Sequence, residues 1–366
     1  MPEPQTPDLR LRVDGQDYGG WTMVQVRRSL DTVCGTFELS VSERWPGRAR
    51  RWAVTAGDAC QVLINGQVVI TGWVDDVEAR YESDAHEILV RGRDRTGDLV
   101  DCCRDEKPDE WSGAKLEAIA AELCRPFGIG VHAAADTGQA LPHCKFNEGE
   151  TVFSFIEKLA RQRAVLVHSD PRGDLVLARA GEGGQAGDAL ELGVNVKAGS
   201  SQVSHRERFS RYTVKGQGAG FEGAMPEIYA GPAGHSQDQG VRRFRPFVVL
   251  AECQGLDVSH QDRARWEAAS RAGKALKITY QTQGWWQRDG RVWPLNAMVR
   301  VRDAYFGLDR ELLVVGLTWR LDNRGGAVTS VEVMPREACE LIPMMPPGAD
   351  WAGFYRLNSG TSGTGS

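Results

Sequence analysis

The sequence lacks the features that mark membrane-spanning, secreted and nucleic-acid-binding proteins. Its longest apolar runs, such as residues 247–251 and 312–317, are far too short to cross a bilayer. The opening residues, MPEPQTPDLR, have no basic segment followed by an apolar one, so we expect no secretory signal. The formal net charge is −5 at pH 7, whereas a general nucleic-acid binder needs clustered Lys and Arg.

The sequence also has none of the short motifs of common enzymes. H-E-x-x-H, G-x-S-x-G and G-x-x-x-x-G-K-[ST] are all absent. Residues 216–220, GQGAG, do not open a predicted helix within a βαβ unit, so they are interpreted as a loop and not as a phosphate site. Asp75 and Asp76 are neighbours on a predicted strand and point to opposite faces, so they cannot flank one glycosidic bond. We therefore expect no catalytic residue and no enzymatic activity.

Cysteine usage gives no sign of disulfides or of a metal site. The eight cysteines are scattered without a C-x-x-C pair, and several occupy positions where a small apolar residue would pack. We interpret them as reduced core thiols in a protein made in the cytoplasm. His132, His143 and Cys144 are candidate ligands by residue type, but a structural zinc site needs four ligands at recognisable spacing. We therefore expect neither a metal ion nor a cofactor.

The clearest pattern present is a β-meander over residues 292–333. Apolar and polar residues alternate in three runs, and the last two runs are joined by residues 322–326, DNRGG, whose Asn and Gly tolerate the positive φ of a tight turn. A similar pattern covers residues 59–93, with Asn65-Gly66 as its first turn. Each stretch has a long strand with a Trp shortly before an Asp, Trp73 in one and Trp319 in the other. This similarity predicts an internal duplication in which the two tryptophans occupy matching positions.

The remaining patterns predict a mainly β fold with α+β insertions. The length of 366 residues corresponds to roughly two to four domains. Helical periodicity over residues 112–128 and from residue 151 is followed by short strands, which indicates a small α/β domain. The expected division is residues 1–101 for a first antiparallel β-barrel, 102–200 for the α/β domain, 201–217 and 276–340 for a second, similar β-barrel, 218–275 for an inserted loop and helix, and 341–366 for a tail rich in Pro, Gly and Ser.

The tail contains three aromatic residues in an otherwise solvated composition: Trp351, Phe354 and Tyr355. They either fold back onto this chain or contact a partner protein. With Trp73 and Trp319 they form the set of candidate interaction residues.

The order of these segments resembles the baseplate hub proteins of contractile-tailed phages, in particular the Mu-like group. It is similar in architecture to the T-even phage hub and to the N-terminal hub part of type VI secretion spike proteins. The residues that carry the resemblance are LCRPFGI at 123–129, GET at 149–151 before a helix that ends LAR at 159–161, residues 170–177, FSRYTVKGQ at 209–217, VWP at 292–294 and the hairpin over 312–335.

The resemblance implies a structural function. In this family each chain has two similar β-barrel tube domains, and three chains form a ring with pseudo-sixfold symmetry. The ring would join the sixfold tail tube to the threefold central spike, contact surrounding baseplate wedge proteins and leave a lumen through which DNA passes without specific binding. It implies a place in the virion, after assembly in the host cytoplasm, and no membrane insertion by this chain. We expect the lumen to be neutral to acidic, because like charge repels phosphate.

Three other interpretations stay open from the sequence alone. A sugar- or protein-binding β-module would be monomeric in solution. A baseplate-associated cell-wall hydrolase would need a cleft with paired carboxylates. A hub component of a type VI secretion-like injection machine would share the barrels, but this sequence ends at Ser366 without an OB-fold or β-helix, which weakens that alternative.

Overall fold

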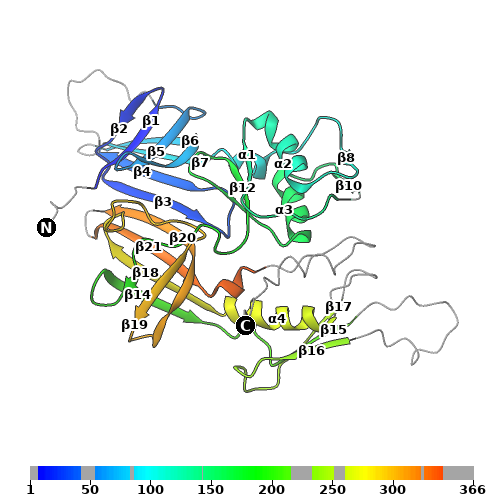
Figure 1. The fold of residues 1–366 in the computed structure, drawn as a ribbon. Coiled ribbons are helices and arrows are strands. Elements are labelled where there is room, and N and C mark those ends of the chain that lie inside the picture. Colours follow the sequence, from blue (N-terminus) through cyan, green and yellow to red (C-terminus); the bar gives the residue numbers. More distant parts are fainter. Residues whose placement is uncertain are drawn as a thin grey trace, which may run out of the picture.

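The structure is a computed structural model, and it describes residues 7–42, 54–82, 86–141, 143–215, 233–250, 260–322 and 325–340. The fold is mainly β, as the sequence predicts (Figure 1). Its first part contains β1 (Leu9–Val13), β2 (Gln16–Tyr18), β3 (Met23–Ser29), β4 (Thr36–Ser42), β5 (Ala59–Ile64), β6 (Gln67–Tyr81) and β7 (His86–Asp94). Then follow α1 (Gly97–Asp101), β8 (Glu110–Trp111), α2 (Leu116–Cys124), η1 (Arg125–Phe127), β9 (Val131–Ala133), β10 (Cys144–Lys145), α3 (Val152–Gln162), β11 (Leu166–Ser169) and β12 (Leu175–Ala178). The last part contains β13 (Leu190–Glu191), β14 (Val196–Val203), β15 (Arg211–Lys215), β16 (Ala233–Gln237), β17 (Pro246–Leu250), α4 (His260–Lys274), β18 (Leu276–Gln283), β19 (Met298–Asp303), β20 (Leu308–Asp322), β21 (Gly326–Met334) and η3 (Arg336–Ala338).

A 13-stranded sheet dominates the molecule. Its hydrogen-bonded path runs β14-β18-β21-β20-β3-β4-β7-β6-β5-β1-β2, with β19 beside β20 and β13 beside β19. We call β1 to β7 the first half-sheet, and β13, β14 and β18 to β21 the second half-sheet. Pairing of β20 with β3 joins the two, and buried residues of both halves form one core cluster that includes Leu39 and Leu317.

The two half-sheets repeat the same strand order. The path β3-β4-β7-β6-β5 has its counterpart in β14-β18-β21-β20-β19, and every neighbouring pair in both paths is antiparallel. The long strands β6 and β20 both contain 15 residues. Each has a β-bulge at the same place, between Val74 and Asp76 in β6 and between Val314 and Gly316 in β20. The correspondence ends at the next strand, because β13 is parallel to β19 whereas β1 is antiparallel to β5.

One sequence-based assignment is wrong. Residues 201–217 are expected to form the first part of the second barrel, but β15 lies in a separate three-stranded sheet between β16 and β17, beside α4. We call β15, β16, β17 and α4 the β15 module. The strand of the second half-sheet that corresponds to β3 is β14, most of which the expected division places in the α/β domain that ends at residue 200. The alternation of Tyr212 and Val214 does indicate a strand, but its apolar side faces inward within this module.

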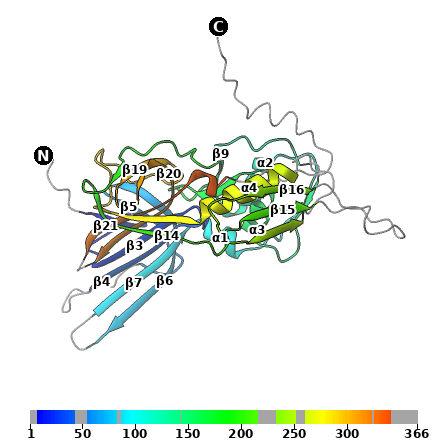
Figure 2. The ribbon, with the colours of Figure 1, turned by 90° about the horizontal axis from the view of Figure 1, so that it is seen from below.

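The helices α1 to α3 and the small sheet β11-β12-β9 form an α/β module with its own core. The second helical segment begins as expected, because the side chain of Thr151 accepts a hydrogen bond from the Ser154 N–H group. The first begins later than predicted, at Leu116 and not after Ser112. Gly128 ends the following η1 turn with a left-handed φ of 66°. Figure 2 shows the helices gathered on one side, with the β6–β7 hairpin extending away from them. In the part of the chain that the structure describes, no helix has the length and apolar character that crossing a membrane would require.

Candidate assembly surface

The junction between the half-sheets is formed along one edge of β20. The first part of this edge pairs with β19, through Leu308 to Leu313. The second part pairs with β3, where Leu317 lies opposite Arg28, Trp319 opposite Val26 and Leu321 opposite Val24. Along one edge, β20 therefore pairs first with β19 of its own half-sheet and then with β3 of the other half-sheet.

The corresponding edge of β6 is only half occupied. Its first part pairs with β5, through Gln67 to Trp73. Beyond the bulge, residues 75–81 have β7 on one side and, within the described chain, no strand on the other. We call this stretch the β6 edge. Its last residue, Tyr81, is 83% exposed.

The counterpart of β3 also presents an open edge. Apart from a single bridge between Leu192 and Val196, β14 pairs only with β18 among the described residues. Its side chains are half-buried or exposed throughout, and Val203 is 63% exposed. We call this side of β14 the β14 edge. The β6 edge and the β14 edge are thus the counterparts of the two strand edges that are joined inside the chain, on β20 and β3.

The exposed face of the sheet carries a row of matched charges. Arg91 contacts Glu78 at 2.6 Å and Glu38 at 3.3 Å, and Lys277 contacts Glu332 at 2.8 Å. The hydrogen bond from Arg91 holds the pKa of the Glu78 carboxyl below its usual value. Pairing along the strands places these residues on one face, which we call the polar face: Gln25, Arg27, Glu38, Asp76, Glu78, Arg80, Arg91, Ser200, Gln202, Lys277, Thr279, Gln281, Arg320 and Glu332.

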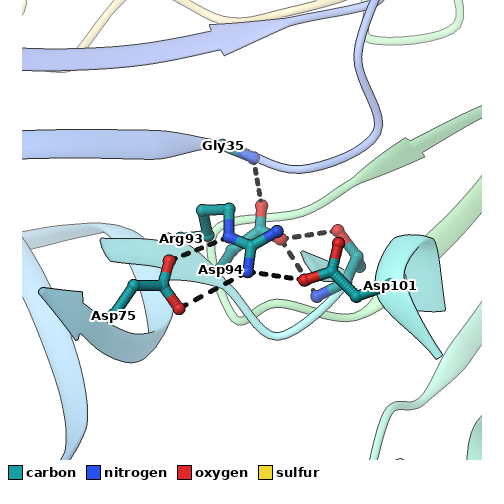
Figure 3. Close-up of polar contacts among 6 residues, drawn as sticks. Gly35, Asp75, Arg93, Asp94 and Asp101 are labelled. Atoms are coloured by element: carbon teal, nitrogen blue, oxygen red, sulfur yellow. Dashed lines mark hydrogen bonds and ion pairs between the residues drawn. The ribbon is translucent and has the colours of Figure 1, made fainter. Parts of the chain in front are cut away.

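Arg93 ties the bulge of β6 to the α/β module (Figure 3). Its Nε lies 2.8 Å from Asp75, the bulge residue, and its Nη2 lies 2.7 Å from Asp101 at the end of α1. Hydrogen bonds to Asp101 and Asp75 raise the pKa of the Arg93 guanidinium. The beginning of the β6 edge is therefore held in a fixed orientation by charge-assisted hydrogen bonds.

Asp94, next along β7, anchors the α/β module from the other side of the strand. Its buried carboxylate accepts hydrogen bonds from the Gly35 N–H at 2.6 Å (Figure 3), the Thr96 N–H at 3.0 Å and the Ser169 Oγ at 2.6 Å. Arg28 donates to the Ser169 carbonyl oxygen at 2.6 Å. Burial raises the pKa of Asp94 and lowers that of Arg28. Arg28 Nε has no hydrogen-bond partner among the described residues, but the Asp94 carboxylate is well partnered, and its buried hydrogen bonds fix the module on the sheet.

The predicted interaction residues differ in how far they are buried. Trp319 is only 1% exposed, and its Nε1 donates to the Trp285 carbonyl oxygen at 3.2 Å, so it belongs to the core of its own chain. Trp73 is half-buried. Trp351, Phe354 and Tyr355 lie outside the described residues.

The prediction that the two tryptophans match in position is also wrong. They lie on corresponding strands, but Trp73 precedes the bulge of β6 and Trp319 follows the bulge of β20. Counted from the bulges, the counterpart of Trp319 is Ala79. Sequence reasoning missed the open edges as well. The length of β6 relative to β5 was the available signal for one of them, whereas the small polar residues of β14 gave none.

The candidate metal ligands His132 and His143 contact different residues. His132 faces Asp174 at 3.5 Å, and His143 faces Ser112 at 3.4 Å. His132, Asp170 and Asp174 could present three ligand atoms within 4.8 Å of one another. The two carboxylates, however, already accept backbone N–H groups of residues 130, 172 and 174, so the cluster is explained as a hydrogen-bonded turn.

Three family models match successive parts of the chain. The Mu phage baseplate assembly protein GpP-like N-terminal domain matches residues 8–94, and the second domain of baseplate hub protein gp44-like proteins matches residues 96–179. The fourth domain of the Mu phage baseplate assembly protein GpP matches residues 257–341.

Individual relatives agree with these matches. The baseplate hub protein gp44 of Escherichia phage Mu is 33% identical over 344 residues, which cover 92% of this chain and 89% of that protein. Among solved structures, the 43 kDa tail protein of prophage MuSo2 from Shewanella oneidensis has a TM-score of 0.81 at 32% identity, over 92% of this chain and 100% of that one. A tail protein from Neisseria meningitidis has a TM-score of 0.77 at 21% identity with the same coverage, a likeness in fold.

Proposed function

The chain belongs to the baseplate hub family of Mu-like phages and is a structural component of the tail baseplate, and from this premise we propose that three copies form a closed ring. The observation that carries the proposal is the pair of open edges. The β6 edge and the β14 edge correspond to the edges of β20 and β3, which are already paired within the chain. If the β6 edge of one copy pairs with the β14 edge of the next, every half-sheet gains equivalent neighbours on both sides.

The internal junction supplies the register of the proposed interface. In one half, Gln25, Glu38, Arg91 and Asp76 lie side by side across the four strands β3, β4, β7 and β6. In the other half, the same row is Ser200, Thr279, Glu332 and Gly316. In these two rows Asp76 corresponds to Gly316, and Gln25 corresponds to Ser200. If β6 pairs with β14 of the neighbouring copy in the same way as β20 pairs with β3, Val77 lies opposite Val203, Ala79 opposite Ser201, and Tyr81 opposite Gly199 of that copy.

Closure by three copies follows from the two half-sheets in each chain. Three chains contribute six half-sheets, and a ring of six similar units matches a sixfold tail tube while the chain as a whole repeats only threefold. We assign the two half-sheets as the two tube domains of the family. Burial of both edges in every copy also removes the exposed strands that would otherwise promote aggregation.

In the proposed ring the polar face lines the lumen. Three of its five Arg and Lys side chains, Arg80, Arg91 and Lys277, are paired with carboxylates, which reduces their attraction for the phosphates of passing DNA. The tail tube or distal tube protein would bind one end of the ring and the central spike the other, with wedge proteins around the outside. The proposed role is mechanical and needs no catalytic residue.

Cysteine cross-linking tests both the ring and its register. A chain with Ala79→Cys and Ser201→Cys should form cross-linked species of up to three chains under mild oxidation, because paired residues on antiparallel strands have Cβ atoms about 4.5–5.5 Å apart. The matched control has Ala79→Cys and Lys197→Cys, because Lys197 lies four positions along β14 from the predicted partner, Ser201. The single variants control for the native cysteines.

Native mass spectrometry of the unmodified protein measures the oligomer independently. A monomer or dimer at every concentration would overturn the ring, whereas a trimer with efficient cross-linking only in the control would overturn the register.

A further inference from the structure

A groove of about 760 Å³ separates the α/β module from the β15 module. Its apolar lining includes Leu30 and Val33 from the β3–β4 connection, Phe153 from α3, Leu166 and Val167 from β11, and Trp266 from α4. All of these except Val33 are partly exposed in the described chain. Partly exposed apolar side chains gathered along one groove indicate a binding surface.

The described chain ends at the mouth of this groove. The turn η3 packs closely on α4, since a Cβ atom on Gly273 would come within 2.7 Å of the Ala338 backbone nitrogen. Trp266 donates from Nε1 to the carbonyl oxygen of Glu340 at 2.7 Å. Cys339 packs in the small cluster that also contains Leu30 and Leu166, two residues of the groove. The direction of the chain at its last described residue is therefore set by side chains that line the groove.

The sequence after Glu340 has the chemistry that the groove would bind. Residues 341–345 are LIPMM, followed by Pro346 and Pro347. The prolines prevent a helix and favour an extended chain, and five extended residues reach about 17 Å. Met side chains adapt well to irregular apolar surfaces.

We propose that residues 341–345 occupy this groove in their own chain, as an apolar strap that joins the α/β module of the first half to the β15 module of the second. The strap would fix the angle between the two modules on the outside of the molecule. It would also place the aromatic residues Trp351, Phe354 and Tyr355 beyond the groove, where they are free to contact another protein. This inference is independent of the ring, since it concerns contacts within one chain.

Cys34 provides a native probe, because it lines the groove and is partly buried. In the full-length protein, labelling of Cys34 by a thiol reagent should be slow. In a chain that ends at Glu340, labelling should be faster by on the order of ten-fold or more, because the cover has been removed. The exposed Cys103 should react at the same rate in both chains and serves as the internal reference. Peptide mass spectrometry gives the rate at each cysteine.

A second variant keeps the test decisive if the shortened chain folds poorly. Met344→Gly with Met345→Gly should expose Cys34 to a similar extent, because it removes two apolar side chains without adding a charge that Arg161, Arg263 or Lys274 of the lining could pair with. Ser359→Gly with Ser362→Gly adds two glycines to the same tail outside residues 341–345 and should leave the labelling rate unchanged. Equal Cys34 rates in the full-length protein and both groove variants would overturn the proposal. Protection that is present only at concentrations where the protein is oligomeric would also overturn it, in favour of a strap from a neighbouring copy.

Discussion

Trp319 and Trp73 show how position relative to a bulge decides what a residue does. Trp319 follows the bulge of β20 and points into the core shared by the two half-sheets. Trp73 precedes the bulge of β6 and remains half-buried, next to the turn that leads into α1. The two residues share a strand type and a neighbouring sequence pattern, but they do not share an environment.

Truncating the two tryptophans should therefore have unequal effects. Trp319→Ala removes a side chain that is almost fully buried and leaves a cavity, so we expect it to lower the free energy of unfolding by about 3–5 kcal/mol. Trp73→Ala should cost less, about 1–2 kcal/mol, because part of its surface is already in water. Urea denaturation followed by circular dichroism measures both. Equal losses would show that the difference in burial does not matter for stability.

The ion pair between Arg208 and Asp238 gives the β15 module a pH dependence. The two side chains meet at 2.6 and 2.9 Å, and Asp238 also accepts from the Gly240 N–H at 2.9 Å. The hydrogen bond from Arg208 lowers the pKa of the Asp238 carboxyl below the ordinary 3.8. A lowered pKa in the folded state means that this pair stabilises the fold above the ordinary value, and that the stabilisation is lost as the pH falls through the lowered value.

Asp238→Asn should lower the free energy of unfolding at pH 7 by about 1.5–3 kcal/mol, the usual range for hydrogen bonds to a charged group. The difference between variant and parent should shrink as the pH is lowered below 3.8, because the parent carboxyl then becomes neutral too. Urea unfolding at a series of pH values checks this. Asp105→Asn, at an exposed position, is the control and should have little effect at any pH. A variant effect that is the same at pH 7 and pH 3 would contradict the electrostatic explanation.

At the scale of elements, the paired bulges in β6 and β20 decide which side chains face the core. In β20, Leu313 and Val315 pack in the small cluster near Leu30, whereas Leu317 and Trp319 pack in the main core. Leu312 and Val314 pack in the main core as well. A strand exposes alternate residues to opposite faces, so the extra residue at the bulge changes which alternate positions face the main core.

Deleting Thr318, which follows the bulge, should abolish cooperative folding. The deletion would shift the pairing of the rest of β20 with β21 by one residue, so Trp319 and the residues after it would turn to the wrong face. Deleting Gly307 in the turn between β19 and β20 should be tolerated better, because turns accept changes of length. Soluble yield and the steepness of thermal unfolding compare the two deletions. Cooperative unfolding of the Thr318 deletion at a normal temperature would show that the register of β20 does not set the facing of its side chains.

At the scale of the whole molecule, the pairing of charges on the polar face bears on how DNA would pass through a ring. Arg91 is held between Glu78 and Glu38, and hydrogen bonds to these two carboxylates raise the pKa of its guanidinium. Replacing Glu38 and Glu78 would leave Arg91 without its carboxylate partners in every chain of the ring. A channel lined in this way would bind phosphates instead of letting them slide past.

Glu38→Gln with Glu78→Gln should therefore increase the affinity of the assembled protein for double-stranded DNA at low salt. The slope of log affinity against log salt should become steeper by at least about one unit, as expected for each additional phosphate contact. Fluorescence anisotropy with a labelled duplex measures both quantities. Glu106→Gln with Glu148→Gln, at exposed positions off the polar face, is the matched control. DNA binding by this control equal to that of the polar-face variant would mean that net charge alone, and not the lumen, is responsible.

The sequence by itself determined the elements whose signal is local. The meanders around Asn65-Gly66 and over β19 to β21 could be predicted because alternating apolar residues and turn residues are adjacent in the chain. The helix that begins after Thr151 could be predicted for the same reason, and so could the duplication of the meander. The baseplate hub resemblance came from the order of these segments, and the 33% identity to the Mu hub protein confirms it.

Only the tertiary structure decided how the elements are joined. It placed β15 outside the large sheet, made β14 a strand despite its small polar residues, and paired Trp319 with Val26 across nearly the whole length of the chain. The open edges on β6 and β14, on which the proposed ring depends, belong to the same class of feature. Strand edges bind through backbone N–H and C=O groups, which every residue except proline carries in full. Because these groups are the same whatever the side chain, the sequence pattern that predicts a strand does not say which strand will lie beside it.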